Sequence, residues 1–584
     1  MNTHTCPVYT EVTGCQDCYK CLRGCPVKAI RIEQSRAMVI PEECILCGNC
    51  VETCPVEAKK VRDDLGRAQF LIQQGRPVFA SLAPSWISAF PGISPAAMVQ
   101  SLYNAGFAGV SETALGAEEV SAHAAQLLEK AQPGVHISTA CPVVVELISK
   151  YYPHLAGTLM PLVSPAEAHA RLLRREFGEE IAVVFIGPCI AKKHEADAPE
   201  SGIDIAITFD DVHTWLGKNG YAQPAHGAAF IPKNAGSGVL YPVDGGMIAG
   251  IGAADRGICC MSFSGITQIK RALEQVDALP ADSTVFLELL ACEGGCVNGP
   301  AAGSRTASAF KRYAVLHQGQ TAPDPDRPRL DISKHYAAFP VVALQHESET
   351  VRGILRSIGK HCLKDELNCG GCGYERCRDF AAAMLEGKAE QTMCVSYMRS
   401  LAQKKANALI QTMPSGVVIV DRELCIVECN AQFAALMGED TVLEYAASPG
   451  LAGVNVSGIV PFAELFRTVL DIGDDILNRD IRNGKQVLHV SVFSIEAHQY
   501  AGAVIQDITT PVVQKEHIIS RARQVIKQNL ETVQKIAYLL GENASETEVI
   551  LGSIVASFEE SGNEHDAAGS EQITGKEAAD AAFS

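Results

Sequence analysis

Apolar runs and amphipathic stretches alternate through the middle of the chain. Residues 181–186 and 284–290 are apolar almost throughout, as in strands covered on both faces of a sheet, and residues 77–84 fit a strand that enters a loop. Residues 96–105 and 114–128 place apolar side chains at helical spacing. Strands that alternate with helices predict an α/β domain with parallel pairing, in which sites collect at strand ends.

Beyond residue 407 the pattern changes to that of a smaller α+β unit. Residues 416–421 and 425–430 fit two strands, and residues 431–437 fit a short helix. Residues 487–494 and 501–508 fit two further strands, the first with alternating apolar and polar positions.

The segment after this unit has apolar residues seven positions apart, with two more near the complementary seam. These residues are Ile519, Ile526, Val533, Leu540, Ala522 and Ile536. The repeat predicts a short coiled coil and hence a homodimer, and an amphipathic helix lying on its own domain fits it almost as well. From Gly562 onward Ala, Gly, Ser, Asp and Glu dominate, which predicts a disordered tail.

Length and charge narrow the range of functions. A chain of 584 residues with 47% hydrophobic residues predicts three to five packed domains. Its formal net charge of −18 argues against nucleic acid and anionic membranes as partners. No positively charged start precedes an apolar run, and no apolar stretch is long enough to span a bilayer, so we expect a cytoplasmic protein.

The 22 cysteines indicate metal or redox chemistry rather than disulfides. Residues 15–55 contain the run C-x2-C-x2-C-x3-C-P twice, the spacing of bacterial two-cluster ferredoxins, in which each fourth cysteine binds the other cluster. Paired zinc ribbons are the alternative, and the tight spacing favours cubanes. We assign one electron-transferring 4Fe–4S cluster to Cys15, Cys18, Cys21 and Cys54, and a second to Cys44, Cys47, Cys50 and Cys25.

A third group of cysteines follows the spacing C-x2-C-x4-C-x16-C. Its members are Cys369, Cys372, Cys377 and Cys394. Residues 380–390 have helical spacing, which allows the last cysteine to fold back onto the first three, and residues 398–407 fit a connecting helix. The stretch from Asn368 to Cys377 resembles a small 4Fe–4S module appended to several anaerobic enzymes, with zinc as the alternative. Six cysteines lie outside every pattern and are expected to be buried or bystander thiols: Cys6, Cys259, Cys260, Cys362, Cys425 and Cys429.

Four further cysteines lie in three short stretches of the middle domain. The stretches are Thr139-Ala140-Cys141-Pro142, Gly187-Pro188-Cys189-Ile190-Ala191-Lys192-Lys193-His194-Glu195 and Glu288-Leu289-Leu290-Ala291-Cys292-Glu293-Gly294-Gly295-Cys296-Val297-Asn298-Gly299-Pro300. Glycine lets a backbone approach an inorganic cluster without an intervening Cβ. In order and character these stretches resemble the three signature motifs of the iron-iron (FeFe) hydrogenases.

The resemblance implies a six-iron cofactor, the H-cluster, in which a 4Fe–4S cubane joins a diiron unit that has CO, CN⁻ and a dithiolate with a central amine. The implied cubane ligands are Cys141, Cys189, Cys292 and Cys296. Cys296 would also bridge to the diiron unit, Lys192 would donate to a cyanide and Glu195 would pair with that region. The stretch Ala83-Pro84-Ser85 resembles the one that lines the cofactor pocket. The alternative is an iron–sulfur scaffold with a bare cubane, which would need neither Lys192 nor Glu195.

Departures from the family pattern, above all in the proton relay, predict slow turnover. Active producers have two adjacent cysteines where this chain has Ala140 and a ligand cysteine, and alanine cannot transfer a proton. Residues 114–128 lack the later acids of the proton relay, since Glu118 and Glu119 lie near the start and His123 fits a structural role. The remaining differences are Gly187 and Leu290 in place of methionines, and Gly299-Pro300-Ala301 in place of a glycine run.

Residues 408–510 resemble a PAS domain, with Asn430 closing the second strand. PAS domains commonly sense ligands or mediate dimers, and His489 and His498 fit sheet residues better than ligands. The predicted organisation is therefore multidomain α/β and α+β. Its parts are a two-cluster ferredoxin domain (1–68), an H-cluster domain (69–357), a 4Fe–4S module (358–398), a PAS-like domain (408–510), a helical or coiled-coil segment (511–558) and a disordered tail (559–584).

These features favour a sensory FeFe hydrogenase of low turnover from an anaerobic host, which interconverts or senses protons and H2 and signals through its PAS domain to an unknown partner. A metabolic hydrogenase coupled to a redox partner such as ferredoxin is the second hypothesis, and a non-catalytic iron–sulfur scaffold or electron carrier is the third. Either hydrogenase would require dedicated maturation enzymes, because no chain makes CO and CN⁻ ligands by itself.

Overall fold

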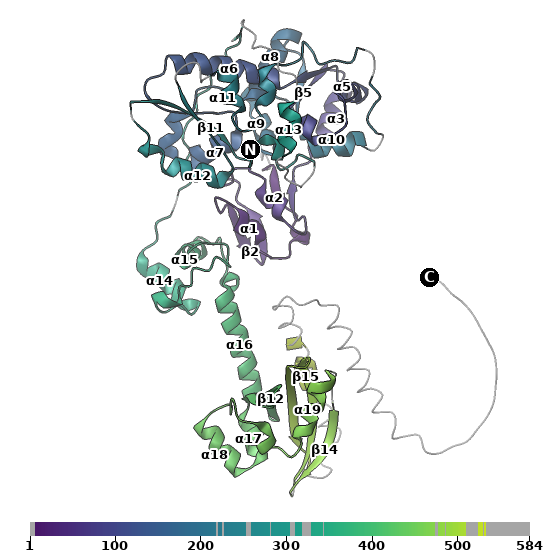
Figure 1. The fold of residues 1–584 in the computed structure, drawn as a ribbon, viewed down its shortest axis with the longest axis vertical. Helices are drawn as coiled ribbons and strands as arrows, with labels where there is room; N and C mark the ends of the chain where they lie inside the picture. Colours follow the sequence, from purple (N-terminus) through teal and green to yellow (C-terminus); the bar gives the residue numbers. More distant parts are fainter. Residues whose placement is uncertain are drawn as a thin grey trace, which may run out of the picture. The chain divides into compact units, whose positions relative to one another are not determined.

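The computed structural model divides into two compact units, Met1–Tyr397 and Met398–Ser584 (Figure 1). It describes residues 6–217, 220–224, 227–252, 258–280, 282–303, 310–317, 327, 329–342, 344–473, 477–484, 486–509, 524–529 and 531–532. Among these residues no helix is both long and apolar enough to cross a membrane. The predicted tail lies outside the described residues, as do all the predicted coiled-coil positions except Ile526.

The N-terminal part of the first unit folds the cysteine run twice in the same way. Left-handed backbone recurs at positions 29 residues apart, at Asp17 and Leu46 and again at Tyr19 and Gly48, because each copy turns tightly around its cysteines. β1 pairs antiparallel with β4, and β2 with β3. The elements are β1 (Val8–Thr10), α1 (Lys20–Gly24), β2 (Ile30–Glu33), β3 (Arg36–Val39), α2 (Asn49–Thr53) and β4 (Lys59–Val61).

The α/β part contains two parallel sheets, which confirms the predicted pairing. One has the strand order β6-β5-β8-β9 and the other β10-β11-β7. The strands are β5 (Val78–Leu82), β6 (Gly109–Glu112), β7 (Gly134–Ile137), β8 (Ala182–Gly187), β9 (Ile205–Thr208), β10 (Cys259–Ser264) and β11 (Thr284–Leu290). The predicted strands at 181–186 and 284–290 correspond to β8 and β11, which are buried almost throughout because helices cover both faces.

Helices connect these strands, as the alternation of patterns predicts. The α-helices are α3 (Leu65–Gln73), α4 (Trp86–Ala89), α5 (Pro95–Asn104), α6 (Ala114–Glu129), α7 (Pro142–Tyr151), α8 (Pro165–Phe177), α9 (Ala191–Asp197), α10 (Phe209–Leu216), α11 (Gly246–Ile251), α12 (Ile266–Glu274) and α13 (Lys311–Leu316). Short 3-10 helices include η2 (Pro153–Thr158), η5 (Ser237–Leu240) and η8 (Cys296–Asn298). The helices predicted at 96–105 and 114–128 are α5 and α6.

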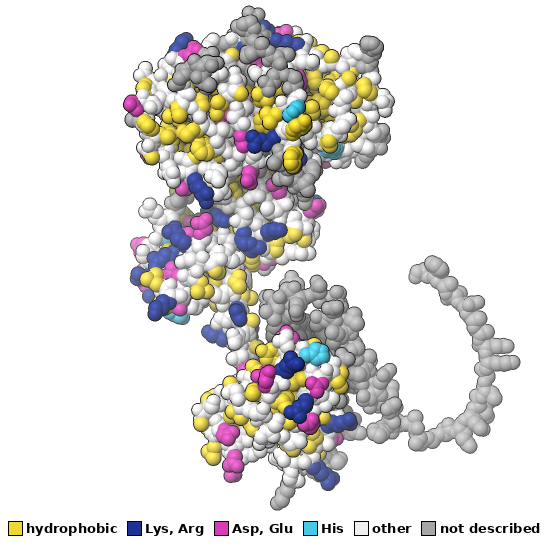
Figure 2. Space-filling model, in the orientation of Figure 1, with side chains coloured by type: hydrophobic (Ala, Val, Ile, Leu, Met, Phe, Trp, Pro, Cys, Tyr) yellow, Lys and Arg dark blue, Asp and Glu magenta, His cyan; other side chains and the backbone are white. Residues whose placement is uncertain are grey.

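The third cysteine group lies in a small helical module that packs on the ferredoxin part. Its elements are α14 (Ser348–Ser357), η9 (Leu363–Asp365), α15 (Cys377–Leu385) and η10 (Gln391–Met393). The predicted helix over 380–390 is too long, because α15 ends at Leu385 and Gly387 takes left-handed backbone. The backbone N–H of Ile32 donates to the Lys388 carbonyl at 2.8 Å. Lys and Arg side chains gather on the surface around α14 (Figure 2).

The second unit contains a five-stranded antiparallel sheet of order β13-β12-β16-β15-β14, with helices packed on it. This unit confirms the predicted PAS-like α+β fold. Its elements are β12 (Gly416–Asp421), β13 (Ile426–Cys429), α17 (Ala431–Met437), α18 (Glu439–Ala447), η11 (Val456–Gly458), α19 (Ala463–Ile472), β14 (Leu477–Asn483), β15 (Gln486–Glu496) and β16 (Tyr500–Asp507). His489 lies on β15 as predicted, whereas His498 lies in the turn after it, with left-handed backbone, and is not a sheet residue.

Helix α16 (Val395–Thr412) precedes this sheet and is longer than the predicted connecting helix. Asn430 is fully buried at the end of β13 and makes four hydrogen bonds. Its side-chain amide donates to the carbonyls of Ile410 and Ser415, and its oxygen accepts from the N–H groups of Val417 and Phe433. Because all four groups are satisfied, this asparagine fixes the end of α16 against the start of the sheet.

Candidate functional site

The four cysteines of the middle domain come together where the two parallel sheets end. Cys141 follows β7 and caps α7, Cys189 follows β8, and Cys292 follows β11. Cys296 begins η8, one turn after Cys292. All four line a single cavity, so the structure brings together residues from three distant stretches of sequence. Sites at the carboxyl ends of strands are expected in this architecture.

Most of the remaining cavity wall is apolar. Ala83, Pro84 and Ser85 follow β5 and line the cavity, as their resemblance implies. The backbone near the cysteines is tightly packed, since a Cβ at Gly295 would lie 2.3 Å from the Pro242 carbonyl oxygen. Gly295 also has a φ of +99°, so only glycine fits this turn between the two cysteines. Four thiols in a water-poor, apolar cavity are a donor set that suits an iron–sulfur cubane.

Lys192 supplies the positive charge in this cavity. Its Nζ atom lies 2.7 Å from Ser164 Oγ and forms an ion pair with Glu195, one helical turn further along α9. The Ser164 hydroxyl in turn donates to Glu195. Burial raises the pKa of Glu195, but the Lys192 ammonium and these hydrogen bonds outweigh burial and hold that pKa below its usual range. A fixed ammonium therefore faces the cavity, which suits an anionic ligand there.

The residues that line this cavity lie in a stretch of the chain that matches a known family. Residues 76–300 match the family described as iron only hydrogenase large subunit, C-terminal domain. This part of the chain is an iron-only hydrogenase domain. Residues 7–55 match a 4Fe–4S dicluster domain, and residues 365–396 match a putative Fe–S cluster family. The matches support an iron–sulfur oxidoreductase with hydrogen-related redox chemistry and an H-cluster in the hydrogenase domain.

Solved structures similar to the chain include two forms of the FeFe-hydrogenase HydA1 from Chlamydomonas reinhardtii. One variant is 17% identical with a TM-score of 0.40, and an apo form is 16% identical with a TM-score of 0.38. Each similarity covers 48% of this chain and 100% of the other. The PAS domain of an HTR-like protein from Haloarcula marismortui is 22% identical with a TM-score of 0.15, over 19% of this chain and 99% of the other. A comparison with curated proteins found no match.

The titratable residues of helix α6 make structural contacts in the hydrogenase domain. Ala140 lines the cavity at the place where the relay cysteine is expected. Glu118 accepts a hydrogen bond from the Gly236 N–H, and Glu119 accepts one from the Leu330 N–H at 2.7 Å. His123 lies 2.7 Å from the Leu330 carbonyl oxygen, which agrees with its predicted structural role. These acids therefore hold neighbouring loops in place.

Glu288 is a buried acid that has no role in the predicted site. It lies on β11 four residues before Cys292, and its carboxylate accepts from the N–H groups of Met247 and Ile248 at 3.3 and 3.1 Å. Burial raises its pKa to about 7. The available signal was a single acid inside an otherwise apolar strand, because burial of a carboxyl in such a run is costly without a purpose.

The ferredoxin part holds the second predicted cluster set around one cavity. The cysteines that line it are Cys25, Cys44, Cys47 and Cys50. This is the set assigned from the sequence, with Cys25 crossing over from the first run. Cys6 makes a side-chain hydrogen bond with Cys44, so this thiol, which fits no motif, lies beside a proposed ligand.

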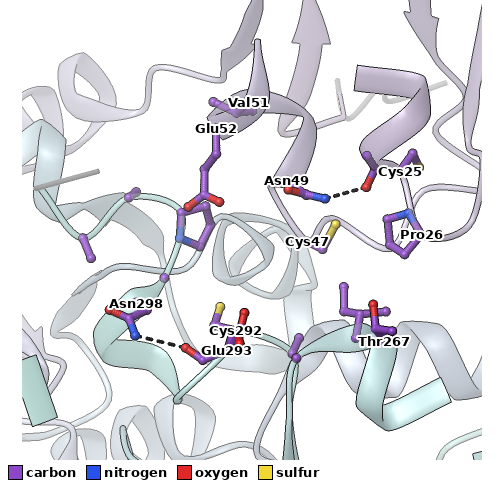
Figure 3. A pocket seen from close by; sticks show the side chains of 18 of the residues that line it. Cys25, Pro26, Cys47, Asn49, Val51, Glu52, Thr267, Cys292, Glu293 and Asn298 are labelled. Carbon is purple, nitrogen blue, oxygen red and sulfur yellow. Dashed lines mark hydrogen bonds between the residues drawn. The ribbon is translucent and has the colours of Figure 1, made fainter. Parts of the chain in front are cut away.

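The second cluster site of the ferredoxin part packs against the hydrogenase motifs. A groove of about 1300 Å³ separates Cys25 and Cys47 on one wall from Cys292 on the other (Figure 3). Beside it the two parts touch, since a Cβ at Gly48 would lie 2.6 Å from Pro300 and 2.8 Å from Ile190. Gly48, with a φ of +79°, is therefore required both for the turn and for this close approach.

The third cysteine group lies next to the first cluster site. The Tyr19 hydroxyl forms a hydrogen bond with Thr392, close to Cys394. A Cβ at Gly373 would lie 3.1 Å from the Leu22 side chain, which follows Cys21. Cys369 is exposed, so this module presents its cluster site to solvent. The protein contacts thus follow one order, from the exposed module through the ferredoxin part to the hydrogenase cavity.

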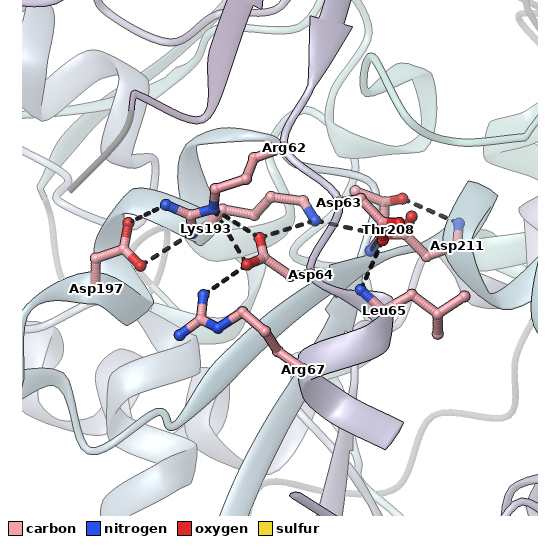
Figure 4. A network of polar contacts seen from close by, with 9 residues as sticks. All are labelled: Arg62, Asp63, Asp64, Leu65, Arg67, Lys193, Asp197, Thr208 and Asp211. Atoms are coloured by element: carbon pink, nitrogen blue, oxygen red, sulfur yellow. Dashed lines mark hydrogen bonds and ion pairs between the residues drawn. The ribbon is translucent and has the colours of Figure 1, made fainter. Parts of the chain in front are cut away.

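A buried charge network fixes the ferredoxin part to helix α9 (Figure 4). Asp64 is fully buried and accepts from Arg62, Arg67 and Lys193, at 3.0, 2.6 and 3.2 Å. Arg62 also pairs with Asp197 at the end of α9, through two hydrogen bonds of 2.8 and 2.9 Å. Bidentate guanidinium–carboxylate pairs are geometrically specific. The network therefore holds α9, and with it the adjacent Lys192, at the edge of the cavity.

Proposed function

We propose that the protein is a sensory FeFe hydrogenase of low turnover that responds to H2, or to the redox state H2 sets, and signals through its PAS-like unit. The observation that supports this best is the cavity lined by four cysteines and Lys192, with Ala140 where a proton-transferring side chain is expected. A sensor needs a response to its ligand, whereas metabolic flux needs fast proton delivery. The predicted domain boundaries remain part of this proposal.

Each residue of the cavity has a proposed part in holding the H-cluster. When bound, the H-cluster supplies the iron chemistry that interconverts H2 with protons and electrons. Cys141, Cys189, Cys292 and Cys296 would hold its iron–sulfur part. Lys192, held by Ser164 and Glu195, would donate a hydrogen bond to an anionic ligand. The apolar wall excludes water, which strengthens that contact.

Electrons would enter or leave through the accessory clusters. We propose three 4Fe–4S clusters, bound by the first two cysteine sets and by Cys369, Cys372, Cys377 and Cys394. Exposure of Cys18 and Cys369 makes the first cluster site and this last module the favoured places for a redox partner such as a ferredoxin. The contacts of Gly48 with Pro300 and of Leu22 with Gly373 would keep the cysteines of the module, of the ferredoxin part and of the cavity in neighbouring parts of the protein.

The signal would pass along helix α16. This helix begins directly after Cys394, a proposed cluster ligand, and is followed after Ser415 by the first PAS strand, β12. Asn430 donates to the Ile410 carbonyl near the end of α16 and accepts from the N–H groups of Val417 and Phe433. A displacement of α16 would therefore also move β12 and α17. An output partner and a homodimer are proposed with this role.

Infrared spectroscopy of the anaerobically matured, full-length protein tests this function. We expect bands in the CO and CN⁻ stretching region that shift when H2 is added, together with slow H2 evolution. Rapid turnover in the same sample would favour the metabolic hydrogenase instead. A complete complement of iron without such bands would leave the non-catalytic scaffold.

A further inference from the structure

A chain of polar side chains leads from the cavity wall to the protein surface. Lys192 contacts Ser164 and Glu195 at the cavity, and Glu195 forms a side-chain hydrogen bond with Glu167 of helix α8. Glu167 Oε1 then accepts from Lys334 Nζ at 2.7 Å. The Lys334 side chain is 25% exposed, whereas that of Glu167 is 2% exposed, so the chain ends at solvent.

The centre of this chain is a pair of buried carboxyl groups. Two carboxylates in contact cannot both remain ionised without a large electrostatic cost. Oε2 of Glu167 receives no hydrogen bond from any donor in the described part of the chain, and the Glu167 side chain forms a hydrogen bond with that of Glu195. If Glu167 is protonated, its carboxyl group can donate a hydrogen bond to the Glu195 carboxylate, so that both side chains gain a partner.

The surrounding charges place that proton on Glu167. Burial and the charge of Glu195 raise the pKa of Glu167 to about 7, although Lys334 opposes them. The pKa of Glu195 lies below its usual range, because Lys192 outweighs burial. Tyr336 also faces the pair, and burial together with the two acids raises its pKa so far that it stays protonated. Near neutral pH the pair therefore holds one exchangeable proton.

We propose that Glu167 and Glu195 form a proton relay between solvent at Lys334 and the cavity wall at Lys192, in place of the route that Ala140 interrupts. In one passage the O–H bond of Glu167 breaks and an O–H bond forms on Glu195. Glu195 passes this proton to Lys192 as the ammonium releases one to a base in the cavity, and hydronium in the solvent at Lys334 restores the proton of Glu167 and becomes water. One proton moves inward, the reverse sequence moves it outward, and no electron moves within the relay. The inference rests on the proposed hydrogenase function.

The test compares Glu167→Gln with Glu112→Gln in the full-length, matured protein. A glutamine at 167 can still accept from Lys334 and donate to Glu195, so the fold is preserved while the carried proton is lost. Glu112 is the matched control, because it is also buried with a raised pKa and accepts from the Ala235 N–H at 2.8 Å, away from the relay. The first measurement is the infrared C=O stretch of protonated carboxylic acids, in H2O and in D2O across pH.

We expect one deuterium-sensitive carboxylic acid band that titrates near pH 7 to be lost in Glu167→Gln and kept in Glu112→Gln. The band of Glu288, whose pKa is also about 7, should remain in both variants. We also expect Lys334→Met to slow the H/D exchange of this band at least tenfold. H2 evolution should fall at least tenfold in Glu167→Gln and lose its decline above pH 7, with CO and CN⁻ bands intact.

Retention of every carboxylic acid band of the parent protein in Glu167→Gln, or turnover and a pH profile equal to those of Glu112→Gln, would overturn the relay. Missing CO and CN⁻ bands in the parent protein would instead overturn the hydrogenase function. The carboxylic acid band and its exchange through Lys334 still decide in that case whether a proton reaches the cavity wall along this path.

Discussion

Two buried charge clusters flank helix α9, and they shift the pKa of their central carboxyl group in opposite directions. In the network around Asp64, three cations surround one carboxylate, and they hold its pKa below the usual range although burial raises it. In the relay cluster Glu167 has one ammonium and one anionic neighbour, and its pKa rises to about 7. Two adjacent lysines of α9 contact the two clusters: Lys193 binds Asp64, and Lys192 binds Glu195 of the relay cluster.

The difference shows what separates a buried structural charge from a buried functional one. A carboxylate with surplus cations stays ionised and rigid, because both charge and hydrogen bonds favour the anion. A carboxyl beside another carboxylate exchanges its proton close to neutral pH, at some loss of stability. Burial alone does not distinguish them, since Asp64 and Glu167 are both almost completely buried.

The largest effect is expected when Asp64 is neutralised. Asp64→Asn leaves the buried Lys193 and two arginines without their shared anion, which should destabilise the first unit by about 3–5 kcal/mol. Asp63→Asn is the control, because Asp63 is exposed and asparagine can still accept from the Leu65 N–H. Anaerobic chemical denaturation of the full-length protein, followed by loss of cluster absorbance, measures both. Equal shifts for the two variants would contradict the structural role of the network.

The buried hydrogen bonds of Asn430 form an uncharged network that can be compared with the two charged clusters. Asn430→Ala removes four hydrogen bonds at a fully buried position and should destabilise the PAS-like unit by about 2–4 kcal/mol. Asn455→Ala, at an exposed position that caps a 3-10 helix, should cost about 1 kcal/mol or less. Denaturation followed by far-UV circular dichroism compares them. A small effect at Asn430 would mean that α16 is not fixed by this residue.

The next substitution, Glu167→Gln, is expected to stabilise the protein, by an amount that depends on pH. Glu167 has a native pKa of about 7 against an ordinary 4.5, so the native state binds its proton more tightly than the unfolded state does. Its contribution is therefore present below pH 4.5 and is lost as pH rises towards 7. Glu167→Gln should remove this loss and stabilise the protein by about 1–3 kcal/mol at pH 8, with little change at pH 4.5. A variant less stable than the parent at pH 8 would show that Glu167 is ionised and paired, as Asp64 is.

The smallest effect is expected from restoring the missing cysteine. Ala140→Cys should raise H2 evolution by less than about tenfold, because Glu118 and Glu119 are bound to loop N–H groups and do not continue a relay. The assay uses matured protein with equal cofactor content, judged from its CO and CN⁻ bands. A gain of a hundredfold or more would show that Ala140 alone limits turnover and that the route through Glu167 is minor.

Local patterns were sufficient for much of the fold. Strands β8, β11 and β12 and helices α5, α6 and α17 lie where apolar spacing predicts them, because a covered strand or an amphipathic helix has its own periodicity. Element ends were less predictable. Helix α15 stops at Leu385 because Gly387 adopts left-handed backbone, and a glycine leaves no periodic signal.

The cysteine spacings and the three motifs depend on neighbouring residues in the chain, and so the sequence by itself predicted the cluster sets and determined the match to the hydrogenase family. Only the tertiary structure decided which acids serve chemistry. Glu118 and Glu119 lie in loop contacts, while Glu167 and Glu195, 28 residues apart on two helices, share one site. The pKa of a carboxyl depends on the charges packed around it, and those come from segments that sequence spacing does not connect.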